Sequence, residues 1–178
     1  TVTLKGGVGS ASMVTSGFRV AAIAVVNSVG TATIGNGPHF WAASVEVGNE
    51  FGGLGMPAHL SPSDLALRMK GGRQPATTIG LVATDAILTK PQAKRLAIMA
   101  DDGLARAVRP AHAPMDGDTV FAVATQKRPL TDPLPDITEI GMAAGDCLAR
   151  AIARGVYEAT ALPFHGAIPA WRDKFGKT

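Results

Sequence analysis

Two long helical stripes, each preceded by a β-like run, constrain the fold of this chain more than any other feature. The first stripe spans residues 89–109 after an extended run at 78–84, and the second spans 136–159 after a run at 119–125. Their apolar residues recur at helical spacing, with charged side chains off the stripe. Because small residues crowd both stripes, the helices can pack closely on a sheet, and an α/β layered sandwich is predicted.

The first third of the chain favours strands followed by a long connection. Residues 10–14 and 18–27 are predicted strands, joined by a turn at Ser16-Gly17. The second run is almost continuously apolar, which is typical of a strand covered on both faces. Residues 28–60 are rich in glycine and predict a long loop with at most one short element.

Weaker signals mark the remaining segments. Ser61-Pro62-Ser63-Asp64 carries a serine cap, a proline in the first turn and an acid three residues on, so a short helix to Met69 is predicted. Residues 70–76 predict a flexible polar connector. The tail, with Pro163, Pro169 and Trp171, is expected to dock irregularly.

Composition excludes several classes of partner. The 178 residues suit one compact domain, with 46% hydrophobic and 17% charged residues. A net charge of +3, with no basic run and interleaved aromatics, does not indicate nucleic-acid binding. The longest apolar run, at 20–26, is far shorter than the roughly 20 residues that a membrane span needs. With no signal-like start, a cytoplasmic location is expected, and the lone Cys147 is expected in the core.

The local motifs by themselves leave the chemistry open. The glycine run from Lys5 to Ser10 resembles part of a phosphate loop but lacks the lysine after its last glycine, so close backbone approach is the better interpretation. Asp116 and Asp118 flank Gly117 and could form a solvated turn, part of a metal site, or a pair that orients a nucleophile or binds an ammonium group. No ligand cluster has matching spacing, so no metal or other cofactor is expected, and His112 is expected to be structural.

Several runs taken together resemble one family, the self-processing L-aminopeptidase D-esterase/D-amidase (DmpA-type) hydrolases, with nylon-oligomer and pantetheine hydrolases as relatives. The matching runs occur in family order, and jointly they are specific. They are Leu4-Lys5-Gly6-Gly7-Val8-Gly9-Ser10-Ala11-Ser12, Val25-Val26-Asn27, Thr77-Thr78-Ile79-Gly80-Leu81-Val82-Ala83-Thr84-Asp85-Ala86, Asp102-Gly103-Leu104-Ala105-Arg106, and Arg109-Pro110-Ala111-His112 leading to Met115-Asp116-Gly117-Asp118-Thr119-Val120-Phe121-Ala122.

The resemblance implies a self-cleaving amide hydrolase whose nucleophile is Thr77. Cleavage between Ala76 and Thr77 would leave residues 1–76 as the end of an α piece and 77–178 as a β piece. The freed α-amine, with a pKa of about 8, would act as the base for the Thr77 hydroxyl. Lys5 would supply positive charge, and Asn27 would donate a hydrogen bond to the oxyanion or position the hydroxyl.

The resemblance also bears on substrate and assembly. Asp116 and Asp118 would hold the Thr77 ammonium or a substrate amine, and an aspartate pair resembles the nylon-hydrolase branch. Oligoamides, or short peptides with a free amine, are therefore the expected substrates. The family fold is a four-layer αββα sandwich assembled as tetramers of αβ units. The matched runs correspond to the second half of a family member, so a missing N-terminal half or a partner chain is expected.

One departure opens alternatives. Family precursors usually carry asparagine directly before the nucleophile, where this chain has Ala76. Self-cleavage attacks the backbone carbonyl of residue 76, which alanine also has. Besides the self-cleaving hydrolase, the sequence is compatible with a non-catalytic or unprocessed member kept for assembly, or with an aminopeptidase or amidase for a different small substrate. A phosphate-binding module around Lys5 to Ser10 is disfavoured.

Overall fold

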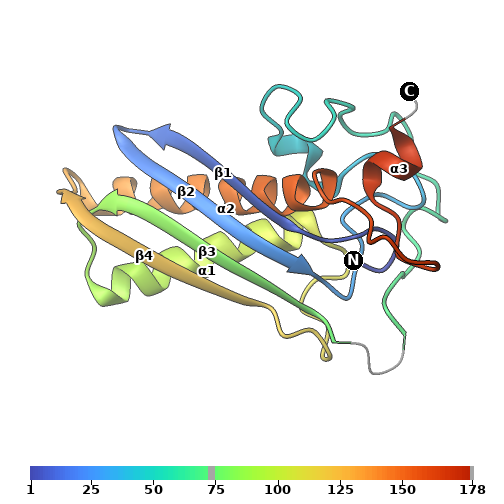
Figure 1. The fold of residues 1–178 in the computed structure, drawn as a ribbon. Coiled ribbons are helices and arrows are strands. Elements are labelled where there is room, and N and C mark those ends of the chain that lie inside the picture. The colour runs from blue at the N-terminus through green and yellow to red at the C-terminus, as the bar shows by residue number, and fades with distance from the viewer. Residues whose placement is uncertain (72–74, 177–178) are drawn as a thin grey trace.

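One mixed sheet and two long helices make up most of the molecule (Figure 1). The computed structural model describes residues 1–71 and 75–176. The elements are β1 (Val8–Thr15), β2 (Phe18–Asn27), the 3-10 helix η1 (Trp41–Val45), β3 (Thr77–Ala86), α1 (Lys90–Ala107), β4 (Thr119–Arg128), α2 (Pro133–Tyr157) and α3 (Trp171–Phe175). The strands lie in the order β1-β2-β3-β4.

The sheet is antiparallel for three strands and parallel for the last pair. Ser16 and Gly17 both have positive φ and form the predicted turn between β1 and β2. β2 pairs antiparallel with β3, which places Asn27 directly opposite Thr77. β4 runs parallel to β3, as it must after the α1 crossover. The start of β3 therefore lies next to the end of β2 and the start of β4.

Both long helices cover the same face of the sheet (Figure 1). Glycines permit this close packing: a Cβ on Gly9 of β1 would lie 2.0 Å from the Ala151 carbonyl oxygen of α2, and one on Gly103 of α1 would lie 2.1 Å from that of Gly145. Cys147 is fully buried between α2 and the sheet, as expected. The predicted α/β layered architecture is confirmed, and this chain supplies one sheet layer and one helix layer.

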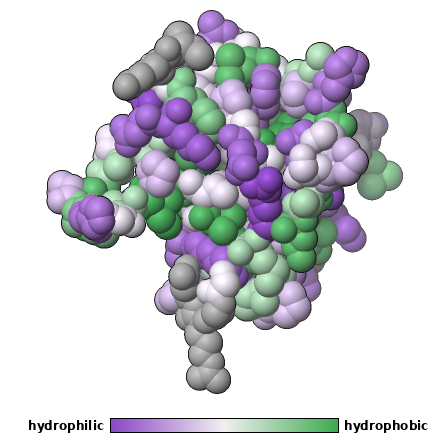
Figure 2. Space-filling model, turned by 90° about the vertical axis from the view of Figure 1, so that its right-hand side faces the viewer, coloured by the Kyte–Doolittle hydropathy of each residue, from purple (hydrophilic) through white to green (hydrophobic). Residues whose placement is uncertain are grey.

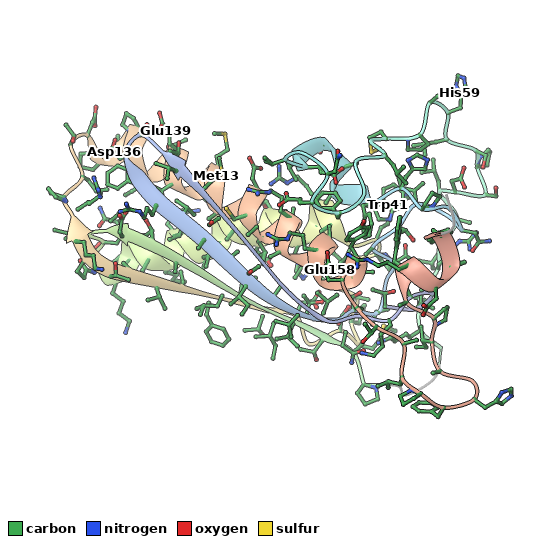
Figure 3. The ribbon with its side chains drawn as sticks, turned by 45° about the horizontal axis from the view of Figure 1, so that its top comes forward. Met13, Trp41, His59, Asp136, Glu139 and Glu158 are labelled. Atoms are coloured by element: carbon green, nitrogen blue, oxygen red, sulfur yellow. The ribbon has the colours of Figure 1, made fainter. Side chains whose placement is uncertain are left out.

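The opposite face of the sheet carries a row of exposed apolar side chains. Figure 3 shows side chains that stand out from this face, away from the helices. The exposed residues come from all four strands: Val8, Ile23, Val25, Ile79, Leu81, Phe121 and Val123. The prediction that residues 18–27 are covered on both faces is therefore not met within this chain, where burial alternates along β2.

The predicted helices at 89–109 and 136–159 are confirmed within a few residues. Thr89 caps α1 through a capping box with Gln92. The predicted helix at 61–69 is wrong, because Ser61 and Asp64 bond to each other in a local turn that does not propagate. The residues after it are largely exposed, so they have no apolar face with which to stabilise a helix. The tail also contains a short helix, α3, where only irregular structure was expected.

Long loops gather at one end of the sheet, far from Glu139, which lies by the β1–β2 turn (Figure 3). Two contacts hold these loops against α2. Glu50 pairs with the buried Arg150 of α2, and Trp171 packs on Tyr157 with ring centroids 4.8 Å apart. Figure 2 shows this end of the molecule, where small polar and apolar patches alternate. Within the described residues, no helix is both long and apolar enough to cross a membrane.

Candidate active site around Thr77

Thr77 begins β3 at the loop-rich end of the sheet, and its hydroxyl lies against the preceding peptide unit. The Thr77 Oγ1 donates to the Ala76 carbonyl oxygen at 2.5 Å. Ala76 is buried, and Thr77 is half-buried. The predicted nucleophile is thus adjacent to the carbonyl that self-cleavage would attack.

The loop before β4 lies directly over this peptide unit. The Gly117 N–H donates to the same Ala76 carbonyl oxygen at 3.0 Å. A Cβ at position 117 would lie 2.8 Å from the Thr77 Oγ1, so glycine allows the loop to approach this closely. A backbone donor aimed at a carbonyl oxygen can stabilise negative charge that develops there. Sequence patterns gave Gly117 no role of its own.

The two aspartates on either side of Gly117 have different environments. The Asp118 side chain is 2% exposed, and its oxygens accept from the backbone N–H groups of Thr78 (2.9 Å) and His112 (3.2 Å). Asp116 accepts from the Val29 N–H through Oδ2 at 2.9 Å. Its buried Oδ1 has no hydrogen-bond partner in the part of the chain that the structure describes. Asp118 is therefore fixed by backbone donors, whereas one Asp116 oxygen accepts from no donor among the described residues and interacts with the Asp118 carboxyl group.

The pKa of Asp116 also reflects its surroundings. Burial raises the pKa of Asp116, and the nearby Asp118 raises it further, while the Val29 N–H and the Lys70 ammonium act in the opposite direction. The net shift is upward. A carboxyl group with a raised pKa and a free oxygen is suited to exchanging a proton.

His112 joins this loop to α1. Its Nδ1 lies 3.3 Å from the Asp118 Oδ2, and its Nε2 lies 3.3 Å from an Asp101 oxygen. Burial raises the pKa of Asp101, and the facing His112 partly offsets this upward shift. His112 lies at the edge of the predicted site, next to a carboxylate that anchors β3, and its structural role stays a prediction.

Asn27 and Lys70 complete the surroundings of the 76–77 bond. The Asn27 Nδ2 donates to the Pro75 carbonyl oxygen at 3.1 Å, and its Oδ1 accepts from the Lys70 Nζ at 2.5 Å. Burial lowers the pKa of Lys70, and Asp116 opposes that shift. Sequence reasoning missed Lys70 because it lies in a connector without periodic pattern. Residues 72–74 of that connector lie outside the described residues.

Lys5 lies one strand away from Thr77, since β2 separates β1 from β3. Its ammonium donates to the Gly6 carbonyl oxygen at 2.9 Å. It lines a cavity of about 630 Å³ together with Asn27, and apolar side chains of the tail, including Leu162, Phe164 and Ile168, form another wall. The structure thus brings Lys5 and Asn27 to one cavity, places Asn27 opposite Thr77 and bonds Asp118 to Thr78, whereas Asp116 bonds to Val29.

The remaining candidates have structural explanations. The glycine run from Lys5 to Ser10 leads into β1 rather than a helix, and a Cβ on Gly7 would lie 2.6 Å from the Gly155 carbonyl oxygen. Gly7 and Gly9 therefore allow close packing on α2, and Gly6 allows close approach to Val26 of β2, which fits the close backbone approach expected from the sequence. The described residues contain no group of three or more histidine, cysteine or acidic side chains that could hold a metal ion.

Comparison with known proteins decides the family. A family model described as peptidase family S58 matches residues 1–167. The chain belongs to this family. Among curated relatives, an uncharacterized aminopeptidase of Mycobacterium bovis is 42% identical over 97% of this chain and 53% of its own length. One from Mycobacterium leprae is 43% identical over 97% of this chain and 49% of its own.

Solved structures agree on the fold. The L-aminopeptidase D-Ala-esterase/amidase of Ochrobactrum anthropi, described as a variant of the Ntn hydrolase fold, matches with a TM-score of 0.60 and 20% identity over 99% of this chain and 50% of its own. A Burkholderia β-aminopeptidase matches with a TM-score of 0.58 and 21% identity over 97% of this chain and 48% of its own. The family predicted from sequence is confirmed, and the chain spans about half the length of its curated relatives.

Proposed function

We propose that this S58 chain carries the nucleophile-bearing part of a self-cleaving amide hydrolase, with Thr77 as the nucleophile. One observation carries the proposal. The Ala76 carbonyl oxygen accepts from both the Thr77 hydroxyl, at 2.5 Å, and the Gly117 N–H, at 3.0 Å. A hydroxyl beside a carbonyl that is already polarised by a backbone donor is the arrangement that an intramolecular acyl shift requires.

The proposed self-cleavage starts from these two contacts and uses Asp116, next to Gly117 in the same loop, as the proton acceptor. The Thr77 Oγ1 attacks the Ala76 carbonyl carbon, its proton passes to the free Asp116 oxygen, and the Gly117 N–H stabilises the oxyanion. The C–N bond then breaks, and the Thr77 nitrogen takes up the proton, which leaves an ester between Ala76 and the Thr77 oxygen. Water hydrolyses this ester to a free Ala76 carboxylate and a free Thr77 amine.

Turnover uses the same hydroxyl. The freed amine of Thr77 takes the hydroxyl proton, and the oxygen attacks the carbonyl carbon of a substrate amide. The amine product leaves with that proton, and water hydrolyses the threonine ester. Asp116, with Asp118 fixed beside it, holds the Thr77 ammonium or the amine of the substrate. Lys5 supplies positive charge near the cavity that Asn27 lines.

The proposed substrates are short peptides or linear oligoamides with a free amine. The aminopeptidase names of the curated relatives support the free amine. The aspartate pair supports the oligoamide branch that the sequence resemblance indicates. The apolar tail residues around the cavity, such as Phe164 and Ile168, suit methylene chains or apolar side chains.

We extend the proposal to the whole protein. The uncovered apolar face of the sheet and the half-length match to relatives support a second half that packs a sheet on this face, as in an αββα sandwich. The proposed assembly of αβ units into tetramers rests on the sequence resemblance alone. Phe121→Lys in the whole protein tests the covered face. We expect a clear loss of melting temperature, and an unchanged melting temperature would show that this face is open to water.

Denaturing mass spectrometry of the whole protein tests the central proposal. We expect two pieces divided between Ala76 and Thr77, one intact chain for Thr77→Ala, and cleavage retained in Thr77→Ser. The cleaved protein should hydrolyse an aminoacyl p-nitroanilide or a linear 6-aminohexanoate dimer. Hydrolysis that persists in uncleaved Thr77→Ala would refute the proposal, and an uncut, inactive wild type would favour the non-catalytic alternative.

A further inference from the structure

The Asn27 side chain, opposite the start of β3, is bonded at both ends of its amide. Its Oδ1 accepts from the Lys70 Nζ at 2.5 Å, and its backbone carbonyl oxygen accepts from the same ammonium at 3.1 Å. Its Nδ2 donates to the Pro75 carbonyl oxygen at 3.1 Å. Because an ammonium can only donate, Lys70 determines which end of the Asn27 amide faces Pro75.

Lys70 is itself held in place near the site. Its backbone N–H donates to the Val29 carbonyl oxygen at 3.0 Å, and the Val29 N–H donates to Asp116. Within the described part of the chain, no carboxylate lies within ion-pair distance of the Lys70 ammonium. The hydrogen bonds of this partly buried cation therefore go to Asn27 rather than to an acid.

The residue before Thr77 makes such a support necessary. Ala76 has no polar side-chain atom that could hold the 76–77 bond in place. Its carbonyl is held by the Gly117 N–H, and the carbonyl before it, that of Pro75, is held by Asn27. Two successive carbonyls are thus fixed from two sides of the strand, which restricts the rotation of the peptide unit that the Thr77 hydroxyl faces.

We propose that Lys70 is a positioning residue for self-cleavage: it orients the Asn27 amide so that Asn27 holds Pro75 and presents the Ala76–Thr77 bond to the Thr77 hydroxyl. The inference rests on the self-cleavage proposed above. Once the bond is cut, a substrate replaces the Pro75–Ala76 segment at the hydroxyl. Self-cleavage is therefore the reaction in which the hold of Asn27 on Pro75 is measured directly.

The test measures self-cleavage of freshly synthesised whole protein over time by mass spectrometry. Lys70→Met keeps the length of the side chain but removes the donor, and we expect cleavage to slow by about tenfold or more, the effect of losing a charge-assisted hydrogen bond. Lys70→Arg restores a cationic donor and should cleave within about threefold of wild type. Lys127→Met, an exposed lysine near the far end of β4, is the matched control and should match wild type.

A second measurement separates positioning from stability. Lys70→Met should keep its melting temperature unchanged, and rescue by Lys70→Arg should restore the cleavage rate, which a loss of stability alone would not explain. If Lys70→Met does not fold, Lys70→Gln, which retains a neutral donor, takes its place and should cleave at an intermediate rate. Cleavage of Lys70→Met at the wild-type rate, or failure of Lys70→Arg to restore it, would overturn the role of Lys70 while leaving self-cleavage intact. A wild type that never cleaves would overturn both.

Discussion

Two carboxylates near opposite ends of β3, the buried Asp85 and the half-buried Asp116, differ in how completely they are bonded. Asp85, near the end of the strand, accepts from the Arg19 N–H at 2.8 Å and from the Arg128 Nε at 3.0 Å, so both of its oxygens are engaged. Asp116, beside the start of the strand, has one oxygen bonded to Val29 and one buried oxygen without a partner among the described residues.

Their pKa values move in opposite directions for this reason. Burial raises the pKa of each carboxyl. At Asp85 the Arg19 N–H and the Arg128 guanidinium outweigh burial and hold the pKa below its usual range. At Asp116 the neighbouring Asp118 adds to burial, and the pKa stays above its usual range. A fully bonded acid stabilises a fold, whereas an acid with a free oxygen is available for chemistry.

Asp116→Asn should give the largest effect. A small effect would contradict the proposed difference in role between Asp116 and Asp85. Removing the acceptor should lower both self-cleavage and turnover by about 10²- to 10⁴-fold, the usual contribution of a proton-transfer group. Mass spectrometry and amide hydrolysis measure the two rates. Asp85→Asn is the control and should leave both rates within about threefold of wild type. Equal losses in the two variants would show that Asp116 acts only through the fold.

Gly117→Ala tests the contact that distinguishes the Thr77 end of the strand. The new Cβ would lie 2.8 Å from the Thr77 Oγ1, so the hydroxyl or the loop must shift. We expect self-cleavage to slow by about 10²-fold, comparable with the loss of an oxyanion donor. Gly37→Ala, whose Cβ would meet only ordinary contacts, is the matched variant. Normal cleavage in Gly117→Ala would remove Gly117 from the mechanism.

Asp85→Asn should lower the free energy of unfolding by about 1–2 kcal/mol at pH 7, which urea titration measures. The folded-state pKa of Asp85 is lowered. Its stabilising contribution to the free energy of unfolding is therefore fully present above the unfolded-state pKa of about 4, and it disappears as the pH falls through the folded-state pKa. The difference in free energy of unfolding between wild type and variant should therefore approach zero toward pH 2. A difference that stays constant with pH would mean that Asp85 stabilises the fold without its charge.

Phe164→Ala should have the smallest effect and tests whether the cavity lined by Lys5 and Asn27 receives substrate. Loss of apolar wall should raise KM for long apolar substrates by about threefold to tenfold and leave small ones unchanged. Steady-state kinetics on alanyl and leucyl p-nitroanilides measure the difference, and self-cleavage is the internal control. An equal change for both substrates would exclude the cavity as a specificity pocket.

Much of the fold followed from local pattern. Alternation and helical stripes predicted all four strands and both long helices, because these elements bury continuous apolar faces. The helix predicted at 61–69 failed because a capping signal without an apolar face has nothing to pack against. The small α3 escaped prediction because it is held by aromatic packing of Trp171 on the end of α2 rather than by a periodic pattern.

The candidate site divides in the same way. The runs that resemble the family in order were enough to identify the family, and they predict a site made of Thr77, Lys5, Asn27, Asp116 and Asp118. The three-dimensional arrangement was needed to show which aspartate is bonded at both oxygens, that Gly117 reaches the Ala76 carbonyl, and that Lys70 bonds to Asn27. These depend on strand register and loop approach between segments up to 87 residues apart, and no local spacing encodes such distances.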